Sequence, residues 1–374
     1  MRIGIDTRLI NESGIGRYIK NLLIELQKID SKNEYVIFLR NKDFDSLTFP
    51  SNFKKVEADF AWYGIAEQVK FPPLIYSQKI DLMHFPHFNI PIFYHGKFIV
   101  TIHDLIHKHH SMSHATTHGP MVFAIKKMGY TKAFQTALEK SQKILVPSQF
   151  VKDQIIKEWK TKTEKITVTP EGVEENLLKV ASNISKEEIQ KVLKKYYVTK
   201  PFLFYAGNAH PHKNIDRLIT SFFDLQKKYA GLQLVLSGRE NFFWKKILKK
   251  IQDDKLKNII HTGFIPDEEL IAFYSSAKAY IFPSLEEGFG IPILEAMAAG
   301  APVISSNAGS LKEVGGDAAL YFNPNNVADM TEKISMVLSD QKLRNELIEK
   351  GYKRYRQFSW KKMVEQTLKI YEAV

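Results

Sequence analysis

Short apolar runs alternate along most of the chain with longer segments whose apolar residues recur at helical spacing. The runs are bounded by glycine, proline or polar residues and are too short for helices, which is typical of buried strands in a parallel sheet. This alternation predicts an α/β fold in which helices cover both faces of parallel sheets. The predicted strands are 2–6, 35–39, 81–85, 98–102, 143–146, 166–169, 202–206, 232–236, 259–260, 279–282 and 303–304.

The same rhythm starts a second time near the middle of the chain. A chain of 374 residues is long enough for two domains, each with its own core. We expect Rossmann-like domains over residues 1–172 and 173–358, with a polar, lysine-rich stretch up to Lys200 leading into the second set of strands. A last helix over 359–374, capped by Ser359, carries an apolar stripe of Trp360, Met363, Val364, Leu368 and Tyr371.

The stretch PSLEEGFGIPILEAMAAG, residues 283–300, directly follows a predicted strand. Its glycines, Gly288 and Gly290, form a loop that leads into a helix beginning at Pro292, because the fixed φ of proline suits the first helical position. Glycine lets a ligand approach the backbone, and the free N–H groups of a helix N-terminus attract phosphates. The stretch therefore indicates a phosphate site at the end of a strand.

Two carboxylates accompany this phosphate site, Glu287 in the loop and Glu295 in the first turn of the predicted helix. Carboxylates repel phosphates, so we expect these two to accept hydrogen bonds from ribose or sugar hydroxyls. For Glu295 taken alone, a favourable interaction with the helix dipole is an equal alternative. The combination favours a ligand that carries both phosphate and hydroxyl groups.

A second phosphate-binding feature follows the predicted strand 202–206. The loop from Asn208 to Lys213 precedes a helix that begins at Asn214, so Lys213 lies just before a helix N-terminus. A cation is unfavourable at that end of the helix dipole unless an anion lies between them. The position of Lys213 therefore favours a bound phosphate.

In the N-terminal half, glycines and a histidine stand where strands end. The loop 13–16, with Gly14 and Gly16, leads into a helix predicted over 17–27, and its glycine spacing is too short for a dinucleotide fingerprint. His103 follows a strand at the edge where open α/β sheets place their chemistry. A purely structural histidine is the alternative for His103.

Histidines crowd the region around His103, which suggests a metal. Their spacings match no standard ligand set, however, and no carboxylate pairs with them in a pattern. We therefore expect no metal site. The histidines are His84, His87, His103, His107, His109, His110, His114 and His118.

The composition is that of an ordinary globular protein, with 44% hydrophobic and 25% charged residues. The absence of cysteine excludes disulfides and thiolate metal sites and agrees with a reducing compartment. Charges at Arg2, Asp6 and Arg8 leave no room for a signal-peptide core. Since no apolar run approaches the roughly 18 residues of a membrane-spanning helix, we expect a soluble protein of the cytoplasm.

The formal net charge of +12 allows two kinds of acidic partner, nucleic acid or an anionic membrane surface. No helix-turn-helix, zinc or RNA-recognition pattern accompanies the charge, which argues against nucleic acid. The densest basic run lies on a predicted amphipathic helix and its exit, and a solvated lysine-rich face is the simpler interpretation. Its residues are Lys245, Lys246, Lys249, Lys250, Lys255 and Lys257.

Glu287 and Glu295, eight positions apart around G-F-G-I-P and followed by E-A-M-A-A-G-A-P-V-I, resemble the E-x7-E signature of retaining glycosyltransferases of family 4. The resemblance extends over most of the chain. It implies the GT-B fold, in which two Rossmann-like domains direct their parallel sheets toward a central cleft and the last helix crosses back onto the first domain. It also implies transfer of a sugar, with retention, from a nucleotide diphosphate sugar to an acceptor hydroxyl, without a metal or other cofactor.

The resemblance assigns roles to particular residues. Lys213, Glu287 and His103 become the candidate catalytic residues, with Lys213 on the leaving diphosphate and the other two on the transferred sugar, while Glu295 holds the ribose. No carboxylate stands where a covalent nucleophile is needed, so front-face transfer assisted by the leaving phosphate is expected. The implied donor-binding residues are Gly14, Gly16, Asn208, His212, Lys213, Gly288, Phe289, Gly290, Ile291 and Glu295.

At one position the chain departs from the family. Many relatives carry an arginine where this chain has Asn208, and His212 could partly replace that charge. The segment Pro170-Glu171-Gly172-Val173 resembles the family's hinge between the domains.

The sequence does not name the sugar. The segments G-I-G-R-Y and G-N-A-H-P-H-K-N resemble mannosyltransferases of surface polysaccharides such as lipopolysaccharide. That resemblance implies GDP-mannose as donor, a glycan or lipid-linked acceptor, and action at the inner face of the cytoplasmic membrane as a peripheral protein. Two other classes stay open, a GT-B nucleotide-sugar epimerase that needs no acceptor and a non-catalytic basic protein that binds membrane or nucleic acid.

Overall fold

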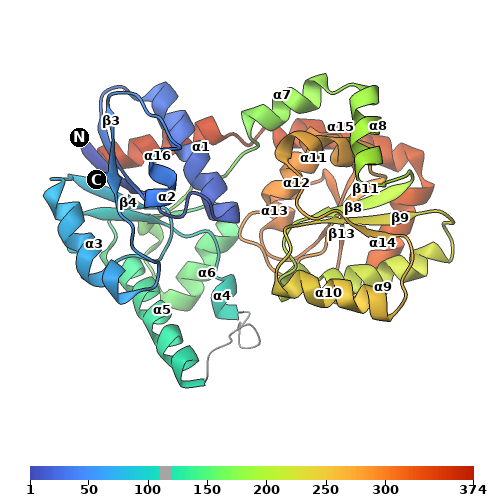
Figure 1. The fold of residues 1–374 in the computed structure, drawn as a ribbon, viewed down its shortest axis with the longest axis horizontal. Coiled ribbons are helices and arrows are strands. Elements are labelled where there is room, and N and C mark those ends of the chain that lie inside the picture. The colour runs from blue at the N-terminus through green and yellow to red at the C-terminus, as the bar shows by residue number, and fades with distance from the viewer. Residues whose placement is uncertain (110–119) are drawn as a thin grey trace. The chain divides into compact units, whose positions relative to one another are not determined.

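The computed structural model describes residues 1–109 and 120–374, which fall into two compact units (Figure 1). Unit 1 comprises Met1–Glu171 and Trp360–Val374, and unit 2 comprises Gly172–Ser359. Each unit is built around its own fully parallel sheet with helices on both faces, so the predicted α/β class with two parallel-sheet, Rossmann-like halves is confirmed.

The sheet of unit 1 has seven strands in the order β3-β2-β1-β4-β5-β6-β7. The order reverses between β1 and β4, which pair with each other although two strands separate them along the chain. Ligands of open α/β sheets bind beyond the carboxyl ends of the strands at such a reversal. The strands are β1 Arg2–Asp6, β2 Glu34–Leu39, β3 Phe53–Glu57, β4 Leu82–Phe85, β5 Phe98–Thr101, β6 Lys143–Val146 and β7 Ile166–Val168.

Helices of unit 1 connect these strands, and the last helix of the chain joins them. That helix, α16, packs against α1. Tyr371 of α16 is buried, and its hydroxyl lies 2.6 Å from Nδ1 of His84 on β4. The helices are α1 Ser13–Ile29, α2 Asn41–Phe44, α3 Ile65–Ser77, α4 Ile106–His109, α5 Pro120–Lys140, α6 Gln149–Trp159 and α16 Trp360–Ala373.

The sheet of unit 2 has six strands in the order β10-β9-β8-β11-β12-β13, with the reversal between β8 and β11. Helices α9, α10 and α14 lie on one side of it and α11 and α12 on the other (Figure 1). The strands are β8 Phe202–Ala206, β9 Gln233–Ser237, β10 Ile259–His261, β11 Ala279–Phe282, β12 Val303–Ser306 and β13 Ala319–Phe322. The helices are α7 Glu175–Asn183, α8 Lys186–Lys195, α9 Ile215–Gln226, α10 Phe242–Asp253, α11 Asp267–Ser276, α12 Ile291–Ala298, α13 Leu311–Gly315, α14 Val327–Ser339 and α15 Gln341–Tyr355.

The structure corrects the predicted start of the first helix. Helix α1 begins at Ser13, so Gly14 and Gly16 lie in its first turn and not in a loop. The N–H of Gly16 donates to the carbonyl of Glu12 at 2.6 Å, and a Cβ at Gly16 would lie 2.4 Å from the carbonyl oxygen of Ile10. Glycine is therefore needed at position 16 because the helix start packs directly on the preceding loop.

The lysine-rich stretch before Lys200 leads into the second set of strands as helical structure. It forms α7 and α8, and α8 starts with a capping box in which Ser185 and Glu188 exchange side-chain and backbone hydrogen bonds. Leu177 of α7 and Leu193 of α8 are buried, so each helix is amphipathic and its lysines lie on the exposed face.

Within the described parts of the chain, no helix combines the length and the apolar character needed to cross a bilayer. The predicted basic helix is α10, where Lys245, Lys246, Lys249 and Lys250 are all exposed. Lys250 pairs with Asp216 at 3.0 Å, and Lys246 lies over the ring of Phe242.

Candidate functional site

The candidate site of unit 2 lies where its strand order reverses. The loop after β8 carries Lys213, and the loop after the neighbouring strand β11 carries Glu287. Because parallel strands present their carboxyl ends at the same edge, the two loops meet there. The structure thus brings together two residues that are 74 positions apart in the sequence.

Lys213 and Glu287 form an ion pair in which Nζ donates to Oε1 at 2.6 Å. Only 15% and 10% of their side chains are exposed, so the pair is largely shielded from water. Charge-assisted hydrogen bonds of this length are strong, and shielding strengthens them further. The sheet edge therefore presents one cation and one hydrogen-bond acceptor at the same point.

The loop that carries Glu287 is held from behind by residues after β12. Ser310 Oγ donates to the carbonyls of Glu287 at 3.0 Å and Phe289 at 2.9 Å. Gly309 has φ +60°, and a Cβ there would lie 2.7 Å from the carbonyl of Glu287. Neither Gly309 nor Ser310 was singled out from the sequence; the signal that could have found them is a glycine followed by serine after a strand.

The loop that carries Lys213 is fixed by the next residue. Asn214 is in the left-handed region at φ 61°, and its Nδ2 donates to the carbonyls of Pro283 at 3.0 Å and Pro324 at 2.8 Å. The carbonyl of His212 accepts from the N–H of Leu285 at 2.7 Å. These contacts join the β8 and β11 loops, a role for Asn214 that the sequence did not reveal.

Glu295 lies deeper than its sequence pattern suggested. Helix α12 begins at Ile291 after Gly290, so Glu295 is its fifth residue and lies beyond the first turn, against the prediction. The carboxylate is 2% exposed and accepts from the hydroxyl of Tyr274 at 3.2 Å. Burial of a carboxylate is costly without such partners, and a group a turn inside the helix gains little from the dipole. The helix-dipole explanation of Glu295 is therefore weakened.

The remaining donor-binding candidates of unit 2 lie on the same two loops, except Ile291, which is the first residue of α12. The side chains of Phe289 and Ile291 are buried, and Phe289 packs edge-on against Phe358, so a ligand would meet their backbone. Asn208 Oδ1 accepts from the N–H of His210 at 3.3 Å, which turns the loop after β8. The rings of His210 and His212 stack with centroids 5.8 Å apart.

Three predicted site residues, Gly14, Gly16 and His103, belong to unit 1. His103 follows β5, and its ring has a partner on each nitrogen, the carbonyl of Pro86 at 3.0 Å from Nε2 and Glu171 Oε1 at 3.2 Å from Nδ1. Burial disfavours the charged ring, but Glu171, the Pro86 carbonyl and Asp104 outweigh it and raise the pKa of His103. From the sequence, Glu171 was predicted only to be part of the hinge segment.

No group of three or more histidine, aspartate or glutamate side chains in the described residues is arranged to hold a metal ion. His84 bonds to Tyr371 and Thr101, and His87 accepts from the N–H of Asn89. Of the other histidines in the predicted crowd, His110, His114 and His118 lie outside the described residues, as do the side chains of His107 and His109.

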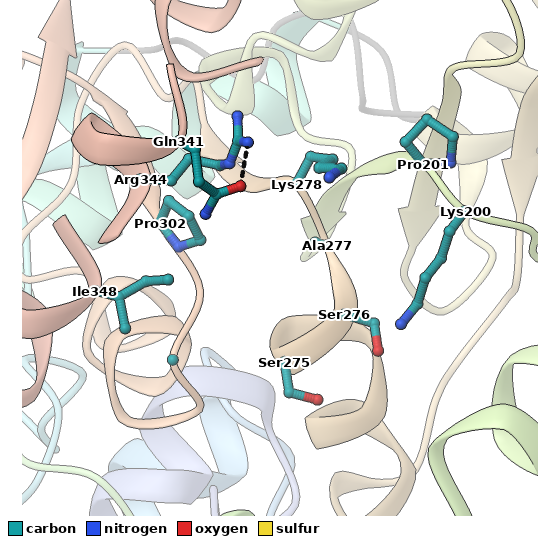
Figure 2. Close-up of a pocket in the computed structure, with 11 residues that line it drawn as sticks. Lys200, Pro201, Ser275, Ser276, Ala277, Lys278, Pro302, Gln341, Arg344 and Ile348 are labelled. Carbon is teal, nitrogen blue, oxygen red and sulfur yellow. Dashed lines mark hydrogen bonds between the residues drawn. The ribbon is translucent and has the colours of Figure 1, made fainter. Parts of the chain in front are cut away.

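A cavity of 480 Å³ lies at the opposite, amino edge of the unit 2 sheet (Figure 2). It is lined by Lys200, Lys278 and Arg344 among others, next to the end of α11. Arg344 donates to the carbonyls of Val337 and Leu338 at the end of α14. Cations at helix C-termini satisfy free carbonyls and complement the dipole, so Arg344 stabilises the end of α14.

Two family models match the chain. The model for glycosyl transferases group 1 matches residues 185–354, and the model for glycosyltransferase family 4 matches residues 13–177. The first spans the loops with Lys213 and Glu287, and the second spans His103 and most of the unit 1 sheet.

Among curated proteins, the O-antigen chain mannosyltransferase B of Escherichia coli is 30% identical over 250 residues, which cover 64% of this chain and 63% of that protein. The chain thus spans less than two thirds of the length of that relative. An uncharacterized glycosyltransferase of Methanocaldococcus jannaschii is 26% identical over 96% of this chain and 94% of its own length.

Among solved structures, HepE from Anabaena in complex with UDP-glucose superimposes with a TM-score of 0.79 at 15% identity, and the match covers 100% of both chains. This likeness concerns the fold. The structural neighbour shows that the fold is GT-B. The two family models together match residues 13–177 and 185–354 and show that the chain belongs to the glycosyltransferases with a family 4 part and a group 1 part.

Proposed function

We propose that the protein is a retaining glycosyltransferase that moves a sugar from a nucleotide diphosphate sugar to a hydroxyl of a glycan or lipid-linked acceptor. The observation that carries the proposal is the Lys213–Glu287 pair at the strand reversal of unit 2. A cation beside a helix start suits a diphosphate, and a carboxylate beside it suits a sugar hydroxyl.

The diphosphate is assigned to Lys213 and to the N–H groups around Gly290, where α12 begins. As the bond between the sugar and the phosphate breaks, negative charge grows on the leaving diphosphate. Fixed donors aimed at that charge stabilise the transition state more than the ground state. Lys213 gains such contact only by sharing or leaving its bond with Glu287.

The hydroxyl groups of the donor are assigned to the carboxylates. Glu287 accepts from the transferred sugar, and Glu295, deeper in the site, accepts from the ribose. His103 is assigned to the transferred sugar on the resemblance to the family. Front-face transfer is proposed, as the resemblance to the family implies. In that step the acceptor oxygen bonds to the anomeric carbon, the bond to phosphate breaks on the same face, and the acceptor proton passes to a phosphate oxygen.

Mannose is proposed as the sugar and GDP as the nucleotide. The support is the mannosyltransferase activity named for the E. coli relative, which points to surface polysaccharide synthesis. UDP-glucose is bound by the Anabaena neighbour, so UDP sugars are the competing donors.

The test is a transfer assay with radiolabelled GDP-mannose or UDP-glucose and a mannose-terminated, lipid-linked acceptor. We expect label in the acceptor, release of one GDP per transfer, and an α-linked product from the α-linked donor. Donor conversion without acceptor would identify an epimerase, and donor binding without conversion would identify a non-catalytic binding protein. Label in the acceptor from UDP-glucose alone would show that the donor is UDP-glucose and not GDP-mannose, while sugar transfer would still be supported.

A further inference from the structure

The ring of His103 is held between two oxygen acceptors from other strand ends of unit 1. Pro86, directly after β4, offers its carbonyl 3.0 Å from Nε2. Glu171, after β7, offers Oε1 3.2 Å from Nδ1. The side chains of His103 and Glu171 are 16% and 7% exposed, so water contributes little to either contact.

These contacts indicate which ring nitrogens of His103 carry a proton. A carbonyl can only accept a hydrogen bond, so Nε2 carries a proton toward Pro86. A carboxylate at Nδ1 requires a proton there as well, since a bare nitrogen would face the lone pairs of Glu171. With Glu171 ionised, His103 is therefore the doubly protonated imidazolium, which agrees with the raised pKa of the ring.

Among the groups around the His103 ring, Glu171 is the negative charge in direct contact with it. Asp104 follows His103 in the chain and adds a more distant negative charge. His84 on β4 is neutral, because burial and the charge of His103 lower its pKa to about 3. Tyr18 on α1 contacts the His103 ring edge-on with centroids 4.9 Å apart, and it contributes no charge.

We propose that Glu171 is a positioning residue that keeps His103 protonated and fixed in orientation at the carboxyl edge of the unit 1 sheet, so that His103 acts in sugar transfer as a fixed cation and not as a proton acceptor. This inference rests on the proposed function. Glu171 is the last residue of unit 1, directly before Gly172 with which unit 2 begins. The segment that connects the two units thus supplies the group that holds the ring.

The experiment compares Glu171→Gln, which keeps size and removes charge, with Glu171→Asp, which keeps charge. Titration of the intact protein labelled with ¹³Cε1-histidine, with His103 assigned through His103→Asn, gives the pKa of that ring. We expect a decrease of about 1–3 in Glu171→Gln, because an opposite charge at this distance shifts a pKa by that amount, and partial recovery in Glu171→Asp. The exposed Glu164→Gln serves as control and should leave the pKa unchanged.

Transfer kinetics give the second measurement. In Glu171→Gln, kcat should match the wild type at low pH and fall about 10-fold for each unit by which the pKa has dropped once pH exceeds both values, with the donor KM unchanged. An unchanged His103 pKa in Glu171→Gln would overturn the proposal even if the protein transfers no sugar, because the titration needs no turnover. A lowered pKa with an unaltered pH profile of kcat would overturn the catalytic part. Absence of transfer by the wild type would contradict the proposed function alone.

Discussion

Lys213 Nζ lies 2.6 Å from Glu287 Oε1, and the two residues belong to loops on either side of the strand reversal in unit 2. The pair couples two roles that the sequence assigned separately, one on the diphosphate and one on the sugar. A bound diphosphate competes with Glu287 for the same ammonium group. Binding of donor should therefore loosen Glu287 and make its oxygens available to the sugar.

Substitution Glu287→Gln separates these roles. Loss of the carboxylate frees Lys213, so donor affinity should stay the same or become tighter. Loss of a charge-assisted hydrogen bond to the sugar should cost roughly 1.5–3 kcal/mol, or about 10- to 150-fold in kcat. Calorimetry and transfer assays on one preparation provide both values. Equal losses of affinity and turnover would show that Glu287 contributes to ground-state donor binding.

Substitution Glu295→Gln should instead weaken donor binding, by about 10- to 150-fold, because the ribose loses a charged acceptor. The matched control is Tyr274→Phe, which removes the hydroxyl that donates to Glu295 at 3.2 Å. That control should lower thermal stability and leave donor affinity within about 3-fold. Calorimetric titration with donor distinguishes the two variants. Full affinity in Glu295→Gln would remove the ribose assignment.

We expect different outcomes when the two glycines at the start of α1, Gly14 and Gly16, are replaced by alanine. Gly16→Ala places a Cβ 2.4 Å from the Ile10 carbonyl, so it should destabilise unit 1 by about 1–3 kcal/mol. A Cβ at Gly14 would lie within 4 Å of no other atom, so Gly14→Ala should keep or slightly raise stability, since alanine favours the helix. Melting temperatures check both. If a ligand approaches the backbone at Gly14, turnover of Gly14→Ala should fall at unchanged stability, and full turnover would exclude that approach.

Most of the strands and the site loops were predictable because parallel strands are continuous apolar runs and the phosphate features follow them directly, whereas β3 and β13 were missed. β1, β6, β8 and β11 have the predicted bounds. Helix α3 was missed because Pro72 and Pro73 lie inside it, and proline usually ends a helix. The capping box at Ser185 was readable, but the surrounding lysines obscured α8.

The contacts that hold the site could not be predicted in the same way. Lys213 and Glu287 are distant in sequence, and their meeting depends on which strands become neighbours. Asn214, Ser310 and Glu171 act through hydrogen bonds to backbone or to a histidine from another loop. Such contacts depend on the register of the loops, which leaves no pattern in the sequence.

The raised pKa of His103 makes stability depend on pH. The folded state binds the proton more tightly than the unfolded chain, whose histidine titrates near about 6.5. The stabilising contribution is therefore complete below that pH and is lost as pH rises through the folded-state pKa. We expect the difference in melting temperature between wild type and His103→Gln to be largest near pH 5.5 and to shrink toward pH 8.5. A difference that grows with pH would contradict the protonated ring.

The most direct measurement for the account as a whole is calorimetric titration of GDP into the wild type and Lys213→Met. The exposed Lys227→Met, at the far end of α9 from Lys213, is the control. Lys213→Met combined with Glu287→Gln removes the effect of an unpaired carboxylate. We predict saturable binding to the wild type and to the control, and affinity about 10- to 150-fold weaker in both Lys213 variants. Wild-type protein that binds neither GDP nor UDP, or Lys213 variants that bind as tightly as the control, would contradict a nucleotide diphosphate site at this pair.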